Sequence, residues 1–176
     1  MMKDIFCDSY VLQAFDQARG EMQLKEDATG QSIIVGGVPN NAILLKLDVD
    51  RKQYKVRSAY LRSGLEFIHK GCDYCLILPD QNLALLFELK SMNPKGYANQ
   101  FVASELFIEY CVKLWNKFNC NNVALDFKRV LLSPKFNRSF TNHREVHKLC
   151  IPDRCNNDVN IISPGFPSRV RLEKLI

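Results

Sequence analysis

The sequence predicts an α/β domain in which helices flank a mixed central β-sheet. Three features lead to this prediction: a β-hairpin over residues 72–90, a long helix over residues 97–118 and a further strand over residues 123–132. Strands that alternate with helices are typical of α/β domains, because each apolar sheet face must be covered by another layer. A chain of 176 residues is long enough for one substantial core, so we expect a single domain spanning residues 1–176.

The predicted hairpin consists of two apolar runs, residues 74–78 and 83–89, around a Pro-Asp-Gln-Asn segment. Runs of strand length around such a cluster favour a hairpin with a four-residue loop. If the residues flanking the loop pair with each other, the register places Asp73 directly opposite Glu88. Side chains alternate between the two faces of a strand, so Glu88 and Lys90 share a face. Two carboxylates and an ammonium group then converge, and repulsion between the carboxylates favours a divalent cation.

The segments before the hairpin are expected to form one helix and then a meander. Apolar residues recur at three- and four-residue steps over residues 9–26, which predicts a helix, although Gly20 interrupts it. Residues 32–35, 42–49 and 53–61 are β-rich runs separated by turn-forming residues. We expect an antiparallel meander with one solvated face.

The segments after the hairpin complete the predicted core, which covers about residues 8–133. We expect the long helix to pack on the sheet through an apolar stripe of Ala103, Phe107, Tyr110, Leu114 and Phe118, which Phe101, Val102, Leu106 and Trp115 widen. Residues 134–176 follow this core. Their polar, basic composition over residues 135–157 predicts an irregular segment, and two short strands are expected at residues 159–162 and 170–175.

Composition and charge restrict the function classes. The chain is 47% apolar and 24% charged, as in soluble globular proteins. Its formal net charge of +5 is compatible with a nucleic acid partner. Arg57 and Arg62, on the most basic predicted strand segment, are candidate phosphate contacts, with a solvated strand face as the alternative.

The chain lacks the features of exported and membrane proteins. The first ten residues contain no apolar signal segment, and no run approaches the roughly 18 apolar residues of a membrane helix. Seven cysteines, an odd number, are scattered along the chain, and we expect them to be reduced thiols. We therefore expect a cytoplasmic protein. A homodimer is compatible with the sequence.

A carboxylate that opens one strand, a Glu-x-Lys sequence that ends the next and a long helix after it resemble the PD-(D/E)xK nuclease superfamily. The matching residues are Asp73, Glu88 and Lys90, with Leu89 at the x position. The resemblance covers about residues 8–133 and implies the restriction-endonuclease-like fold. No residue of the C-terminal segment takes part in it.

The Pro79-Asp80 pair also matches the opening letters of the family motif. Asp80, however, lies in the hairpin loop, and eight residues of strand rise place it roughly 25 Å from Glu88. Carboxylates that share one ion must both approach it closely. Asp73 is therefore the better candidate, although Cys72 stands where the family has proline.

The resemblance implies a metal-dependent nuclease that hydrolyses phosphodiester bonds of nucleic acid, with DNA favoured over RNA. Asp73 and Glu88 would hold Mg²⁺ or Mn²⁺, and the Leu89 backbone carbonyl would be a further ligand. Lys90 would orient or help deprotonate the attacking water and stabilise the charge that develops on the phosphate. The alternative for these residues is a structural ion pair at the end of the sheet.

The resemblance also suggests additional site residues. The family often has a glutamate on its first helix, for which Glu21 is the candidate and Glu66 the alternative. Some members have a glutamine on the helix after Glu-x-Lys, where Gln100 stands in this chain. Lys95, in the preceding loop, is a candidate phosphate contact. Glu21, Gln100 and Lys95 also fit solvated surface positions.

A second group of potential ligands consists of two histidines and two cysteines within thirteen residues: His143, His147, Cys150 and Cys155. Zinc accepts these residue types, but their spacing matches no standard zinc finger. Cys72 and Cys75 also have ligand character, but we expect them to point to opposite faces of a strand.

Other functional classes have less support. The sequence contains no nucleophile elbow and no phosphate-binding glycine loop. The alternative to a nuclease is a catalytically inactive domain of the same fold that binds nucleic acid or protein, with a structural zinc site at residues 143–155. Such a domain is expected in some families, because a fold does not dictate an activity.

Overall fold

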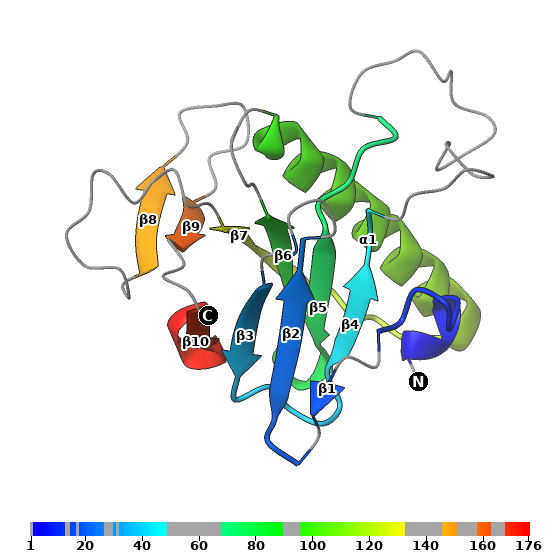
Figure 1. Ribbon diagram of the computed structural model, residues 1–176. Helices are drawn as coiled ribbons and strands as arrows, with labels where there is room; N and C mark the ends of the chain where they lie inside the picture. Colours follow the sequence, from blue (N-terminus) through cyan, green and yellow to red (C-terminus); the bar gives the residue numbers. More distant parts are fainter. Residues whose placement is uncertain are drawn as a thin grey trace.

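The computed structural model describes residues 2–12, 15–16, 18–26, 30, 32–48, 68–89, 96–132, 146–150, 158–162 and 168–176 (Figure 1). These residues form three layers: a four-stranded sheet, a six-stranded sheet and the helix α1. Both sheets contain parallel and antiparallel neighbours. The predicted α/β class with a mixed sheet is therefore confirmed. No helix in the described part of the chain is long and apolar enough to cross a membrane.

The six-stranded sheet forms the middle layer. Its strands, in spatial order, are β4 (Ile43–Lys46), β5 (Tyr74–Leu78), β6 (Leu83–Leu89), β7 (Asp126–Leu132), β9 (Asp158–Ile162) and β8 (Val146–Cys150). β4, β5 and β6 run antiparallel to one another. The helix α1 (Tyr97–Asn119) then connects β6 to β7, which runs parallel to β6. A parallel pair needs such a crossover connection, so α1 covers one face of the sheet.

The predicted hairpin is confirmed in its bounds and register. β5 and β6 cover the expected residues, and Leu78 pairs with Leu83. A 3₁₀ turn over Pro79–Gln81 closes the loop, followed by Asn82 in the left-handed region at φ 48°. Every residue of β5 and β6 is buried, because both faces of the sheet are covered.

Two apolar clusters fill the spaces between the layers. The first, between the two sheets, contains Leu85 and Phe87 of β6. The second, between the six-stranded sheet and α1, contains Ala84 and Leu86 of the same strand. Adjacent residues of β6 thus face different layers, as strand geometry requires.

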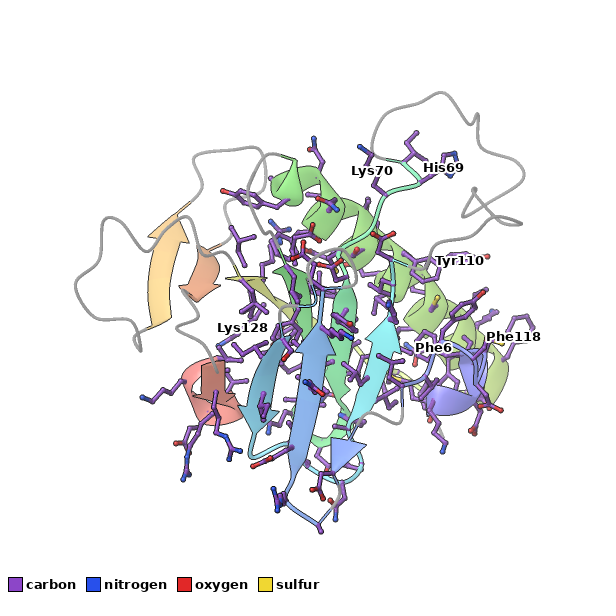
Figure 2. The ribbon with its side chains drawn as sticks, viewed as in Figure 1. Phe6, His69, Lys70, Tyr110, Phe118 and Lys128 are labelled. Atoms are coloured by element: carbon purple, nitrogen blue, oxygen red, sulfur yellow. The ribbon has the colours of Figure 1, made fainter. Side chains whose placement is uncertain are left out.

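The bounds of α1 agree with the predicted helix, and the predicted packing surface is confirmed in part, because Phe101 is buried and Phe107 and Trp115 pack against the core. The buried face contains Phe101, Ser104, Ile108, Cys111 and Val112. Tyr110 and Phe118, assigned to the packed stripe from sequence, are 59% and 80% exposed and project outward from the helix (Figure 2). The helix is apolar on two faces, and the sheet contacts the face that includes Ser104. The Ser104 hydroxyl accepts a hydrogen bond from the Cys72 backbone N–H there at 2.8 Å.

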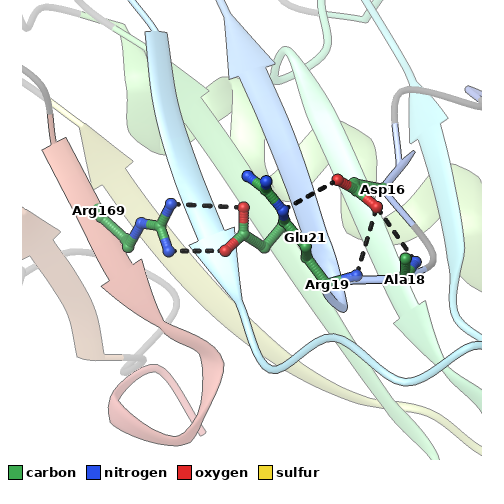
Figure 3. Close-up of polar contacts among 5 residues, drawn as sticks. All are labelled: Asp16, Ala18, Arg19, Glu21 and Arg169. Atoms are coloured by element: carbon green, nitrogen blue, oxygen red, sulfur yellow. Dashed lines mark hydrogen bonds and ion pairs between the residues drawn. The ribbon is translucent and has the colours of Figure 1, made fainter.

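The predicted helix over residues 9–26 is wrong, because strands β1 (Phe15–Asp16) and β2 (Glu21–Lys25) lie in this range. Asp16 Oδ1 accepts the backbone N–H groups of Ala18 and Arg19 in the turn between them (Figure 3). Gly20 completes the turn at φ 58°. In β2, buried Met22 and Leu24 alternate with less buried residues, which is a strand period and not a helical one.

The four-stranded sheet continues with β3 (Ser32–Gly36) and β10 (Ser168–Arg171). β3 pairs antiparallel with β2 and parallel with β10. The expected meander is wrong at β4, which belongs to the other sheet. The third run of that meander, residues 53–61, lies outside the described residues.

The C-terminal segment contains more regular structure than expected. β8 lies within the range predicted to be irregular, where it pairs antiparallel with β9. β9 confirms the strand predicted at residues 159–162. The last predicted strand is shorter than expected, because a 3₁₀ turn over Leu172–Lys174 follows β10.

Replacing Gly20 by alanine tests the β1–β2 turn. An alanine at this position would have to adopt a left-handed backbone conformation. Its Cβ would lie 3.3 Å from the Val38 carbonyl oxygen. We expect Gly20→Ala to lower the free energy of unfolding by about 1–2 kcal/mol in chemical denaturation. A helix at this position would give the opposite sign, a gain of about 1 kcal/mol.

Gly36→Ala is the matched control, since a Cβ there meets nothing within 4 Å. We expect this control to change the stability by less than about 0.5 kcal/mol. An equal loss of unfolding free energy in the two variants would contradict the turn between β1 and β2.

Candidate functional site

Asp73 lies at a bend just before β5, where three strand segments meet. Its side-chain Oδ2 accepts a hydrogen bond from the Leu89 backbone N–H at 2.6 Å. Its backbone carbonyl accepts the Leu47 N–H at 2.8 Å. Asp73 thus joins the end of β6 to the segment after β4 through hydrogen bonds.

The same hydrogen bond brings the Asp73 carboxylate close to Glu88. The hairpin register, which ends with Tyr74 opposite Phe87, places Asp73 opposite Glu88 when continued by one residue. The Leu89 nitrogen is about 2.4 Å from the Glu88 Cα, so Asp73 Oδ2 lies within about 5 Å of that Cα. The two acidic residues therefore occupy the same end of the hairpin.

Glu88 lies in the interior of the protein, with 1% of its surface exposed. It follows Phe87 on β6 and so shares the face of Ala84 and Leu86, which packs toward α1. Its neighbour on β7 is the buried Leu131. An ionised carboxylate at such a position is costly unless hydrogen bonds, an opposite charge or a metal ion compensate it.

The N-terminal half of α1 is anchored to this end of the hairpin by two polar side chains. Ser104 binds the Cys72 backbone N–H, and Gln100 Nε2 donates to the Gly71 carbonyl at 3.1 Å. Gln100, a candidate from sequence, therefore lies near Asp73. Its amide group holds the segment that leads into β5.

A buried ion pair that the sequence analysis missed lies on the same face of the sheet. Arg129 Nη2 of β7 is 2.6 Å from Glu105 Oε2 of α1, and the arginine is almost fully buried. In the register, Arg129 pairs with Leu86, and Leu131 pairs with Glu88. Arg129 therefore lies two residues before the partner of Glu88 on β7. The sequence signal that could have indicated this pair is an arginine directly before the buried run Val130, Leu131 and Leu132.

These side chains form a polar layer between the six-stranded sheet and α1, which we define as Asp73, Glu88, Gln100, Ser104, Glu105 and Arg129. The layer contains three carboxylates and one guanidinium group, and that guanidinium is bonded to Glu105. Asp73 and Glu88 lie at the same end of the hairpin, and two neighbouring carboxylates are a donor set that fits Mg²⁺ or Mn²⁺.

Glu21 does not belong to the polar layer. It lies on β2, in the four-stranded sheet, where Arg169 Nη1 of β10 is 2.6 Å from Glu21 Oε1 (Figure 3). The six-stranded sheet separates this position from the face that packs on α1. The predicted placement of Glu21 on a first helix beside the site is wrong, because residues 21–25 form a strand.

Two of the four candidate zinc ligands, His147 and Cys150, belong to strand β8, where they pair with Ile161 and Asp158 of β9. Outside the described residues are Arg57, Arg62, Glu66, Lys90, Lys95, His143 and Cys155. Among the residues that the structure describes, no group of three or more His, Cys, Asp or Glu side chains is arranged to hold a metal ion.

Cys72 and Cys75 do not point to opposite sides as expected. Both lie in the apolar cluster beneath α1, because the chain bends between them at Asp73. Burial raises the pKa of the Cys75 thiol well above its usual value, and the nearby Cys72 and Cys111 raise it further. The exposed Cys7 has a lowered pKa, because its sulfur lies within hydrogen-bond distance of the Ser9 hydroxyl.

Comparisons of the chain with protein-family models, with curated proteins and with solved structures found no match.

Removing the Asp73 side chain tests its contact with β6. We expect Asp73→Ala to lower the free energy of unfolding by about 1–3 kcal/mol, because the Leu89 N–H loses its acceptor. Asp73→Asn should cost less, since its amide oxygen can still accept that hydrogen bond. The exposed Asp80→Ala in the hairpin loop is the control, with an expected change below about 0.5 kcal/mol. A loss in Asp73→Ala no larger than in Asp80→Ala would contradict the contact.

The cysteines should differ in reactivity in the native protein. The thiolate is the reactive form, so the lowered pKa and exposure of Cys7 favour alkylation, whereas burial and the raised pKa protect Cys75. With iodoacetamide near neutral pH, peptide mass mapping should find Cys7 modified first and Cys75 modified only after denaturation. Equal modification rates of the two thiols would argue against the arrangement.

Proposed function

We propose that this protein is a metal-dependent nuclease that hydrolyses phosphodiester bonds of nucleic acid, with DNA favoured as the substrate. The observation that carries the proposal is the hydrogen bond from the Leu89 N–H to the Asp73 carboxylate, which holds this carboxylate beside Glu88. A pair of carboxylates at the end of a hairpin and beneath a helix is the arrangement that the PD-(D/E)xK resemblance implies.

The order of elements around this pair supports the same proposal. Three antiparallel strands, β4 to β6, lead into α1, which returns the chain to the parallel strand β7. This is the strands–helix–strand order of the resemblance, with the two carboxylates at the expected strand ends. The first helix of the resemblance is replaced by β1 and β2, which is a departure from the family pattern.

In the proposed mechanism, Asp73 and Glu88 would hold Mg²⁺ or Mn²⁺, and the Leu89 backbone carbonyl would be an additional ligand. When bound, the ion would polarise a phosphate oxygen and favour ionisation of a water molecule. Asp73 is partly exposed and Glu88 is buried, so a substrate phosphate approaches from the side of Asp73. Lys90 is proposed to orient the attacking water and to help remove its proton.

A non-catalytic binding domain of the same fold is the second candidate, and two observations favour it. One carboxylate oxygen of Asp73 is bonded to the backbone of β6, and Glu88 is 1% exposed. Both side chains could therefore act mainly as structural groups that join α1 to the sheet. Under this alternative, the chain binds nucleic acid or protein without cleaving it.

Cleavage assays separate the two candidates. Plasmid, single-stranded DNA and RNA are incubated with the protein in Mg²⁺, Mn²⁺ or EDTA, and we expect cleavage of DNA only with a divalent ion. Asp73→Asn and Glu88→Gln keep the shape of each side chain but remove its charge. We expect each variant to lower the cleavage rate by at least about 10²-fold, the scale of losing one electrostatic group in an active site.

Asp80→Asn is the matched control, since Asp80 lies in the loop at the opposite end of the hairpin. It should cleave at the rate of the unaltered protein. Full activity in Asp73→Asn and Glu88→Gln would overturn the site assignment. Nucleic acid binding without cleavage in either metal, unchanged in these two variants, would support the non-catalytic candidate.

A further inference from the structure

The outward face of α1 presents an apolar ridge to solvent. Leu106, Tyr110, Leu114 and Phe118 follow one another at four-residue steps, so their side chains lie along one side of the helix. Leu106 is 60% exposed, and Tyr110 and Phe118 are 59% and 80% exposed. Figure 2 shows Tyr110 and Phe118 projecting outward from α1. Large apolar side chains grouped on one exposed face indicate an interaction surface.

A charged ridge runs beside the apolar ridge, one residue earlier in each turn. It consists of Glu109, Lys113 and Lys117, because the carboxylate of Glu105, one turn earlier, is turned inward to the buried Arg129. The acidic residue lies toward the N-terminus of α1 and the two basic residues toward its C-terminus. Glu109 Oε2 and Lys113 Nζ are 3.6 Å apart, and the Lys113 side chain is highly exposed. The ridge therefore changes sign between Glu109 and Lys113.

This order of charges is complementary to itself when two copies of α1 lie antiparallel. A two-fold axis near residue 111 brings Glu109 of each copy opposite Lys113 of the other. An axis one residue later, about 1.5 Å along the helix, pairs Tyr110 with Leu114 and Leu106 with Phe118. One antiparallel arrangement thus satisfies both ridges, and packing of four-residue ridges is common between helices.

We infer that the protein forms a two-fold symmetric homodimer through the outward face of α1. The charge order identifies a second copy as the partner, because a two-fold axis places Glu109 of each copy against Lys113 of the other. The helix has 23 residues, so the contact extends over about 35 Å. Contacts from a single helix are smaller than a standard interface, so we expect a dissociation constant of about 1–100 µM.

Sedimentation equilibrium tests the dimer directly. Over concentrations from about 1 to about 500 µM, which span the expected affinity, the mass should rise from 20.3 kDa toward twice that value. Tyr110→Lys, in the centre of the apolar ridge, should remain a monomer with an unchanged unfolding temperature, because Tyr110 lies outside the core. Ile176→Lys, an exposed apolar residue outside α1, is the matched control and should still dimerise.

Charge reversal tests the antiparallel register. Glu109→Lys alone and Lys113→Glu alone each place like charges opposite each other in a homodimer, so each should be a monomer. An equimolar mixture of the two variants should form a heterodimer, since both cross-pairs then join opposite charges. Neither variant regains the pair within its own helix, so association in the mixture reports only contacts between copies.

A mass of 20.3 kDa at all concentrations would overturn the proposal. So would a dimer that Tyr110→Lys leaves intact, or a mixture of the charge variants that stays monomeric. Binding of a different protein to the face of Tyr110 in a monomeric sample would assign the surface to that partner and would likewise overturn the homodimer.

Discussion

The hydrogen bond between the Asp73 carboxylate and the Leu89 N–H is the contact on which the arrangement of the site depends. It lies where the chain bends into β5, and it fixes the end of a hairpin whose residues are all buried. The Ser104 and Gln100 side chains bind the two residues before that bend, so α1 is anchored at the same point. One short segment thereby positions the hairpin, the helix and two acidic residues.

This arrangement places the carboxyl group of Glu88 inside the protein. Glu88 faces α1 beside a buried Arg129 that is already bonded to Glu105. Electrostatic interactions are stronger in such surroundings than in water, so the charge near Asp73 and Glu88 must be balanced. A divalent cation provides that balance in the proposed nuclease, and hydrogen bonds alone provide it in the non-catalytic alternative. The same residues would then determine both the stability of the hairpin and its function.

The central elements could be predicted from sequence, because β5, β6 and α1 are long, strongly apolar and bounded by turn residues. Strands β1 and β2 could not be predicted, because the turn that joins them depends on backbone hydrogen bonds to Asp16 and on the left-handed conformation of Gly20. In the site, the proximity of Asp73 and Glu88 follows from strand register alone. The ion pair between Arg129 and Glu105 could not be predicted, because it depends on which face of α1 meets the sheet, and two faces of this helix are apolar.

A crystal of the protein soaked in Mn²⁺ would test the central claim most directly, because anomalous scattering locates the ion without reference to activity. We expect one peak within coordination distance of carboxylate oxygens from both Asp73 and Glu88. The peak should be absent from crystals of Glu88→Gln soaked in the same way. A Mn²⁺ site that touches neither carboxylate, or an unaltered site in Glu88→Gln, would contradict a metal centre at the end of this hairpin.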